Sequence, residues 1–194
     1  MKAALAFAGA TLLATLAMAP AAFGDEEAGN RAYVAASQYG NCYAKSVPTG
    51  RYGLEGRTHV YFVESENDRV VQSYDWFGPQ LRLECNVAGA NDGPVGVSVV
   101  QFGPWARGSV ADAETLAIAF YWNEQLLRRY STLDIAGSAD AVSASVSHYT
   151  VIEDIIGYAW RDGNNFSFSV RTVDGRTIVF DAGSGAILST TSDR

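Results

Sequence analysis

The stretch FSFSVRTVDGRTIVF, residues 166–180, indicates the fold class more directly than any other part of the chain. Large apolar residues alternate with serine and arginine in its first half, and a period of two is typical of a half-buried β-strand. Asp174-Gly175 then favours the tight turn of a β-hairpin. Residues 177–180 predict the returning strand. We therefore expect a hairpin that turns Phe166, Phe168 and Val170 toward the core.

Short apolar runs separated by turns recur along the rest of the chain. Residues 80–85 also alternate with a period of two, and Gly78-Pro79 and Asp162-Gly163 are turn signals. Such spacing predicts a mainly antiparallel all-β fold, a sandwich or barrel of about ten strands with few or short helices. Residues 32–39 and 110–116 are the candidates for short helical turns. Residues 132–136 are a candidate for an extra strand.

The first residues have the pattern of an export signal. Lys2 is followed by an uncharged, Ala-rich segment through residue 24, and Ala22-Phe23-Gly24 places small residues before Asp25. A positive start, an apolar segment and a small-residue cleavage motif define a secretory signal peptide. We predict a signal peptide at 1–24, cleaved before Asp25, and a single β-rich domain at 25–194. The alternative is an uncleaved membrane anchor, but the segment is only weakly apolar.

The two cysteines of the chain, Cys42 and Cys85, are predicted to form a disulfide. An exported protein enters an oxidising compartment, where a lone pair of cysteines usually bridges. A bridge over a loop of about 44 residues contributes about 4 kcal/mol to stability. A thiol enzyme would need an unpaired cysteine with a nearby histidine. A metal site would need more ligands than two cysteines and two histidines at scattered positions supply, so no metal site is expected.

Charge and hydropathy exclude several partners. Lys and Arg number 14 and Asp and Glu number 21, so the formal net charge is −7. This acidic balance argues against nucleic acid as a partner. After residue 24 no apolar run reaches the length that a membrane-spanning helix needs, so no membrane span is expected after signal cleavage. The predicted location is the periplasm or the cell exterior.

Two segments carry a family resemblance. Residues 41–48 (NCYAKSVP) are one, and residues 102–108 (FGPWARG) with 116–121 (LAIAFY) are the other. Together they resemble a group of exported proteobacterial proteins without a known activity. The resemblance implies an exported β-rich protein. It implies no catalytic residue and no cofactor.

The residues that could catalyse a reaction do not form a recognisable arrangement. Serine hydrolysis needs a nucleophile, an imidazole base and an orienting carboxylate. The only histidines, His59 and His148, lie in predicted strands, and no nucleophile-elbow motif is present. We therefore expect no catalytic residue and no cofactor. A glycosidase would need two carboxylates across a cleft, and the sequence offers candidates without pairing them: Asp75, Glu84, Glu153 and Asp154.

Aromatic residues near turns are the candidates for ligand contact. Trp76 precedes Gly78-Pro79, and Trp105 follows Pro104 with Arg107 two residues on. Rings in such loops suit stacking on a ligand, and an arginine beside them can bind an anion. The alternative is that these rings cover the ends of the core. The sequence favours a non-enzymatic protein that binds a protein, a glycan or an envelope component. The alternative function is a carboxylate-dependent hydrolase of a glycan or other envelope polymer.

Overall fold

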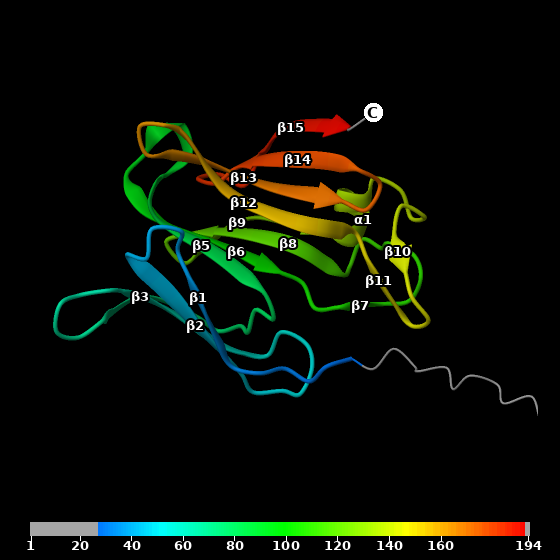
Figure 1. The fold of residues 1–194 in the computed structure, drawn as a ribbon, viewed down its shortest axis with the longest axis horizontal. Coiled ribbons are helices and arrows are strands. Elements are labelled where there is room, and N and C mark those ends of the chain that lie inside the picture. Colours follow the sequence, from blue (N-terminus) through cyan, green and yellow to red (C-terminus); the bar gives the residue numbers. More distant parts are fainter. Residues whose placement is uncertain (1–26, 193–194) are drawn as a thin grey trace, which may run out of the picture.

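The computed structural model describes residues 27–192, so the predicted signal peptide and its cleavage site lie outside the described part. Within residues 27–192 the chain forms fifteen β-strands in four antiparallel sheets, with one short α-helix and one 3-10 turn. The prediction of an all-β, mainly antiparallel fold is confirmed. The sheets stack as a sandwich and do not close into a barrel (Figure 1).

Each of the three four-stranded sheets follows the order of the chain closely. The N-terminal sheet contains β1 (Tyr33–Ala36), β2 (Cys42–Pro48), β3 (Gly56–Phe62) and β4 (Arg69–Tyr74). The middle sheet contains β5 (Leu81–Ala88), β6 (Val95–Phe102), β8 (Leu116–Trp122) and β9 (Gln125–Ser131). The C-terminal sheet contains β12 (Ile152–Asp162), β13 (Asn165–Thr172), β14 (Arg176–Asp181) and β15 (Ile187–Ser192). The small sheet contains β10 (Ser143–Ala144), β11 (His148–Thr150) and β7 (Ala106–Arg107).

The middle sheet lies between the other two four-stranded sheets, so the molecule has three layers (Figure 1). One face of the middle sheet packs on the N-terminal sheet, in a cluster that includes Leu83, Val99 and Val60. Its other face packs on the C-terminal sheet, where Phe120 meets Phe180. Alternation along a strand sends neighbouring residues to opposite faces, so one strand can contribute to both cores. The first five residues of β8 are accordingly all buried.

The hairpin of residues 166–180 has the predicted register. Phe168 pairs with Phe180 and Val170 with Ile178 across the Asp174-Gly175 turn. The side chains of Phe166, Phe168 and Val170 are buried, as predicted. Ser167 and Ser169, which lie between these residues in the sequence, are also nearly buried. Their side chains are small, and β13 has a neighbouring strand on each side, β12 and β14.

Three local predictions are wrong. Residues 132–136 form the helix α1 (Thr132–Ala136), because Ser131 and Asp134 make a capping box at its start. Residues 32–39 contain strand β1, which gains its hydrogen bonds by pairing with β2. Residues 110–115 form no helix, and β8 begins at Leu116. There Asp112 Oδ1 accepts the backbone N–H groups of Glu114 and Thr115 and so forms a local turn.

The disulfide between Cys42 and Cys85 is confirmed, with a Cα–Cα distance of 6.5 Å. It joins β2 of the N-terminal sheet to β5 of the middle sheet. Beside it the buried carboxylate of Glu84 accepts the backbone N–H groups of Cys85 at 3.0 Å and Gln38 at 3.3 Å. Burial raises the pKa of Glu84 above its ordinary value. These contacts fix the β1–β2 turn against the edge of the middle sheet.

No helix within residues 27–192 has the length and apolarity to cross a membrane.

Truncation of Phe168 tests the packing of the two layers. Its fully buried ring contacts Phe102, Phe120 and Tyr158, so Phe168→Ala should lower the free energy of unfolding by about 3 to 5 kcal/mol. Urea unfolding at pH 7 measures the loss. Val146→Ala is the control, because Val146 is 88% exposed, and it should change stability by less than about 0.5 kcal/mol. A loss below about 1 kcal/mol for Phe168→Ala would contradict the register of the hairpin.

Candidate functional site

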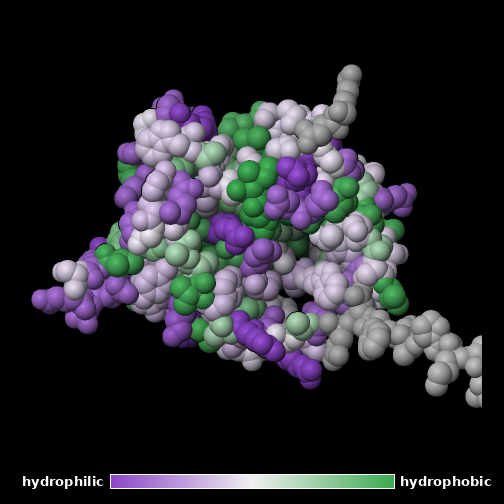
Figure 2. All heavy atoms as spheres, viewed as in Figure 1, coloured by the Kyte–Doolittle hydropathy of each residue, from purple (hydrophilic) through white to green (hydrophobic). Residues whose placement is uncertain are grey.

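A cavity of about 600 Å³ opens between the middle sheet and the C-terminal sheet. It lies beside β5 and β12, which are the edge strands of those two sheets. Figure 2, drawn from the same side as Figure 1, shows the hollow with apolar side chains in its depth. An opening at the edges of two stacked sheets is accessible from solvent and still reaches the core.

The apolar walls of the cavity come from separate parts of the chain. The nearly buried side chains of Phe102 and Leu116, from β6 and β8, line its depth. Trp105, in the segment between β6 and β7, lines it as well and is 42% exposed. One face of the Trp105 indole stacks on the imidazole of His148, with the ring centres 4.3 Å apart. The packed histidine therefore holds an exposed aromatic ring at the cavity.

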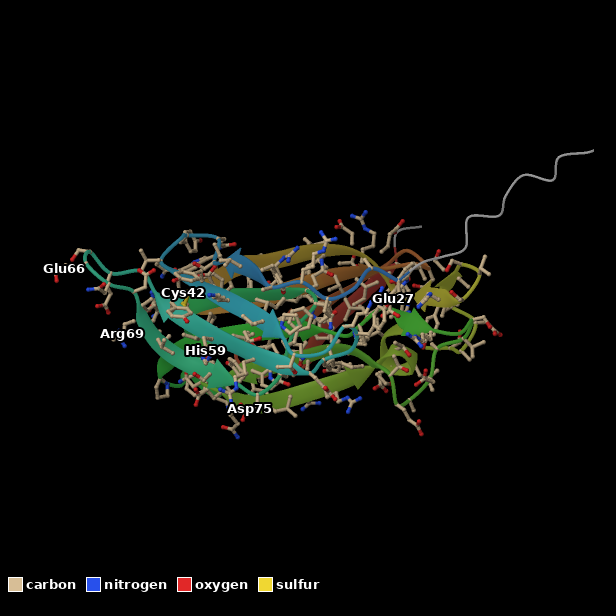
Figure 3. The ribbon with its side chains drawn as sticks, turned by 90° about the horizontal axis from the view of Figure 1, so that it is seen from below. Glu27, Cys42, His59, Glu66, Arg69 and Asp75 are labelled. Atoms are coloured by element: carbon tan, nitrogen blue, oxygen red, sulfur yellow. A yellow bond between two sulfur atoms is a disulfide. The ribbon has the colours of Figure 1, made fainter. Side chains whose placement is uncertain are left out.

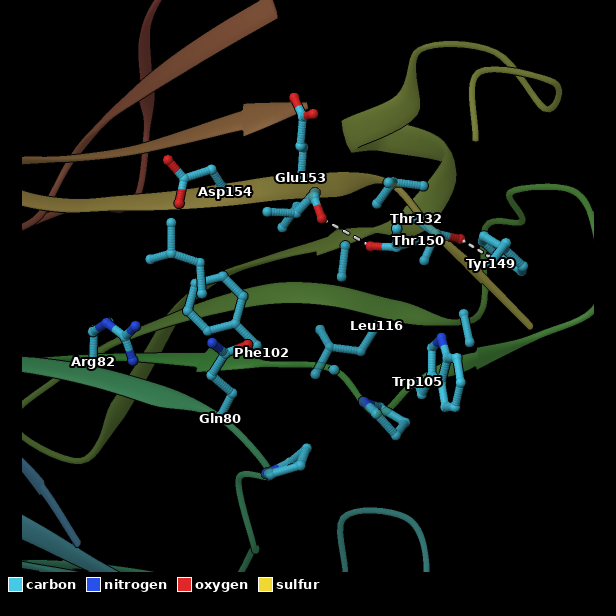
Figure 4. Close-up of a pocket in the computed structure, with 18 residues that line it drawn as sticks. Gln80, Arg82, Phe102, Trp105, Leu116, Thr132, Tyr149, Thr150, Glu153 and Asp154 are labelled. Atoms are coloured by element: carbon cyan, nitrogen blue, oxygen red, sulfur yellow. Dashed lines mark hydrogen bonds between the residues drawn. The ribbon is translucent and has the colours of Figure 1, made fainter. Parts of the chain in front are cut away.

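The cavity also presents charged side chains, from Arg82, Glu153 and Asp154. Arg82 of β5 donates one hydrogen bond, from Nη1 to the carbonyl of Leu81 at 3.0 Å. Among residues 27–192, no carboxylate lies within ion-pair distance of its guanidinium. Glu153 and Asp154 of β12 are exposed and border the same cavity. Figure 4 places Arg82 and Trp105 at opposite ends, with Phe102 and Leu116 between them.

A hydrogen-bonded group fixes one wall of the cavity. The Tyr149 hydroxyl donates to Asp112 Oδ2 at 2.9 Å and lies 2.9 Å from the Thr132 hydroxyl. Asp112 also accepts the backbone N–H and the hydroxyl of Thr115. These donors, the Thr115 N–H above all, lower the pKa of Asp112 from 3.8 to about 2. Asp112 is therefore ionised at neutral pH and positions Tyr149 rather than supplying a proton.

The three residues predicted to contact a ligand lie in different places. Trp105 lines the cavity. Arg107 lies outside it on β7, where its guanidinium pairs with Glu27 at 2.8 Å. Trp76 packs against Tyr74 and Tyr121 between the N-terminal and middle sheets and does not line the cavity. The structure thus brings one of the three to the cavity.

The carboxylates proposed for the alternative hydrolase are also dispersed. Glu84 is buried beside the disulfide, and Asp75 is exposed, 3.9 Å from Arg57. Glu153 and Asp154 share the cavity rim, but neighbouring strand residues generally project to opposite faces. In Figure 4 the Glu153 carboxylate points away from the cavity. Among residues 27–192, no group of three His, Cys, Asp or Glu side chains is arranged to hold a metal ion.

Sequence reasoning missed Arg82 and Phe102. Arg82 occupies a polar position of an alternating strand, a pattern that also describes any solvent-facing residue. Phe102 ends a strand of mostly apolar residues that are buried from position 97 to 102, where periodicity does not separate one face from the other. Their shared cavity follows from how the sheets stack, and the sequence carries no local signal of that stacking.

Comparisons with protein families and with curated proteins identify no relative of this chain. No protein-family model matches the chain, and a search of curated proteins finds no match. The resemblance to exported proteobacterial proteins therefore stays a prediction.

The hydrogen bonds to Asp112 make the free energy of unfolding depend on pH. Because folding lowers the pKa of Asp112 to about 2, the stabilisation is complete above pH 3.8 and is lost as the pH falls toward 2. Asp112→Asn should therefore lower the free energy of unfolding at pH 6 by about 1 to 2 kcal/mol. Denaturant unfolding from pH 6 to pH 2 should show the difference from wild type shrinking below pH 4. Asp140→Asn, at an exposed position, is the control; a difference that does not change with pH would exclude this role for Asp112.

Proposed function

We propose that this chain is an exported, non-enzymatic binding protein of the periplasm or cell exterior. Its ligand occupies the cavity between the middle and C-terminal sheets. The proposal rests on one observation: a single cavity contains the exposed indole of Trp105 and the guanidinium of Arg82, which has no ionic partner among residues 27–192. Ligand sites typically combine an apolar wall with a few well-placed polar groups.

The lining indicates the chemistry of the ligand. A half-buried guanidinium binds a carboxylate or phosphate group through parallel hydrogen bonds. Trp105 and Phe102 offer apolar and aromatic surface to a flat or hydrophobic body. Asp154 can accept hydrogen bonds from hydroxyl or amine groups at the rim. The expected ligand is an envelope glycan or protein segment that carries an anionic group beside an apolar or flat part.

A carboxylate-dependent hydrolase is the second candidate function. It is supported by the position of Glu153 and Asp154 on the cavity rim. A glycosidase needs two carboxyl groups that face one bond from either side. Adjacent residues on one strand do not meet this requirement, so the geometry favours binding over hydrolysis.

Two further observations support export. The predicted signal peptide gives the route, and the Cys42–Cys85 disulfide is of the kind that persists in oxidising compartments. The proposed partner is a component of the envelope or the surroundings of the cell, and the acidic net charge argues against nucleic acid.

Capture experiments with cavity variants test the proposal. With the chain from Asp25 as bait in envelope extracts, Trp105→Ala and Arg82→Gln should each weaken capture of the same ligand about tenfold or more. Both should leave the unfolding midpoint nearly unchanged, because neither side chain is fully buried. Trp160→Ala is the matched control, since Trp160 is also exposed but does not line the cavity.

Two outcomes would contradict the proposal. If both cavity variants capture as much as wild type, the ligand binds elsewhere. If the wild-type chain cleaves labelled envelope glycans and Glu153→Gln or Asp154→Asn abolishes cleavage, the protein is a hydrolase.

A further inference from the structure

The cavity lies beside the edges of two sheets that do not pair with each other. β5 is the first strand of the middle sheet, and β12 is the first strand of the C-terminal sheet. An edge strand presents backbone N–H and C=O groups that have no partner strand. Part of the β5 edge is covered by the turn between β1 and β2, where the Gln38 N–H donates to the Glu84 carboxylate. The β12 edge has no second strand beside it among residues 27–192, so it is the edge that a partner can reach.

The start of β12 turns backbone groups toward this open edge. The Val173 N–H donates to the carbonyl of Val151 at 3.2 Å, so that carbonyl points toward β13. In a planar trans peptide the C=O and N–H point in opposite directions, so the N–H of Ile152 points away from β13. The carbonyl of Ile152 accepts the Thr150 hydroxyl at 2.8 Å, and this bond lies at the cavity wall (Figure 4). A side chain thus donates to a strand carbonyl beside the place that a neighbouring strand would take.

Irregularities in β12 limit how long an added strand can be. The pairing of β12 with β13 shifts register between Ile152 and Asp154 and again between Ile155 and Gly157. Such bulges bend a strand and interrupt the row of hydrogen bonds that it offers to a neighbour. An added strand is therefore confined to the few residues of β12 that line the cavity.

The cavity lining faces one side of such an added strand. A strand that extends the C-terminal sheet turns alternate side chains toward the middle sheet, which is the depth of the cavity. There Phe102 and Leu116 supply apolar surface, with Trp105 at one end and Arg82 at the other (Figure 4). Side chains two positions apart on one face of a strand are separated by about 7 Å. One peptide can therefore place an acidic group on Arg82 and an apolar group on the aromatic wall.

We propose that the ligand of the cavity is an extended peptide that adds as a strand to the edge of β12. Its carboxylate binds Arg82, and an apolar side chain on the same face of the peptide packs on Phe102 and Trp105. The inference rests on the proposed function and selects a protein segment over a glycan. A peptide backbone repeats donors and acceptors at the spacing of a sheet edge, and strand addition is a recurrent mode of peptide recognition.

Selection from a displayed library of random linear peptides supplies the probe. Peptides that bind the wild-type chain should carry an acidic and an apolar residue with one or three positions between them, so that both lie on one face. By fluorescence anisotropy, Arg82→Gln and Trp105→Ala should each weaken binding of a selected peptide about tenfold or more. Arg57→Gln is the matched control, because Arg57 is exposed and lies 3.9 Å from Asp75 on the N-terminal sheet, away from the cavity lining (Figure 3). Trp160→Ala is the control for the indole.

Two measurements on the backbone separate strand addition from side-chain contact alone. Methylation of single backbone nitrogens in the peptide should weaken binding about tenfold or more at alternate positions only, because a strand turns every second N–H toward its neighbour. In the protein, saturating peptide should slow hydrogen exchange of the Ile152 amide about tenfold or more. The Val173 amide is already bonded to Val151, and its exchange should change little.

The source of the carboxylate has its own comparison. Replacing the acidic side chain of the peptide by its amide should abolish the dependence of binding on Arg82 if that side chain is bound. Amidation of the peptide C-terminus should do so if the terminal carboxylate is bound. Either result supports a carboxylate on Arg82, and dependence on Arg82 that survives both changes would contradict it.

The failures of the two proposals are distinguishable. If no selected peptide binds, or if binding leaves the Ile152 amide unprotected and tolerates every methylated nitrogen, strand addition is overturned. If a uronic acid hexasaccharide then binds in a way that depends on Trp105 and Arg82, the cavity stays the binding site and its ligand is a glycan. Peptides that protect Ile152 but bind both cavity variants as tightly as wild type would refute the proposed cavity contacts and leave strand addition.

Discussion

The central strands of the middle sheet, β6 and β8, are packed on both faces, and this constraint organises the rest of the molecule. Because both faces are packed, polar residues on these strands need partners inside the protein. The Ser98 hydroxyl donates to the carbonyl of Ala182 at 3.0 Å and accepts from Tyr158 at 3.1 Å, and Gln101 accepts from Tyr121 at 3.1 Å. Each of these bonds ties the middle sheet to a neighbour or fixes a ring in its core. Solvent reaches this sheet at its edges, and the cavity lies at one of them.

The sequence predicts those elements whose signals are local. The hairpin of residues 166–180 has alternation, a strong turn dipeptide and a matching return strand, and no tertiary contact contradicts them. Residues 132–136 contain Leu and Ile, which suit a strand as well as a helix. The Ser131–Asp134 capping box decides for the helix, and this signal is local to the sequence. Strand β1 differs, because its Ala-rich sequence favours a helix and only the pairing with β2 makes it extended.

Of the residues that line the candidate site, the sequence predicts one, Trp105, as a ligand contact. Trp105 is predictable because Gly103, Pro104 and Gly108 around it disfavour a regular strand, which leaves its ring in a loop. Trp76 has a similar setting, but the N-terminal sheet packs over its surroundings and places it among Tyr74 and Tyr121. Trp105 and His148 are far apart in the sequence, and only the completed fold stacks their rings. Contacts between layers are determined by packing, which a single sequence does not display.

The three large sheets are each built almost entirely from strands that pair with their neighbours in the chain. Such meanders let each large sheet form from one continuous stretch of the chain. A chain that emerges from its N-terminus can then form one layer after another. The first layer stays incomplete until the second arrives, because its apolar face has nothing to cover it. Cys42 meets Cys85 at that step, so oxidation would seal the first docking of layers while the C-terminal sheet is still to come.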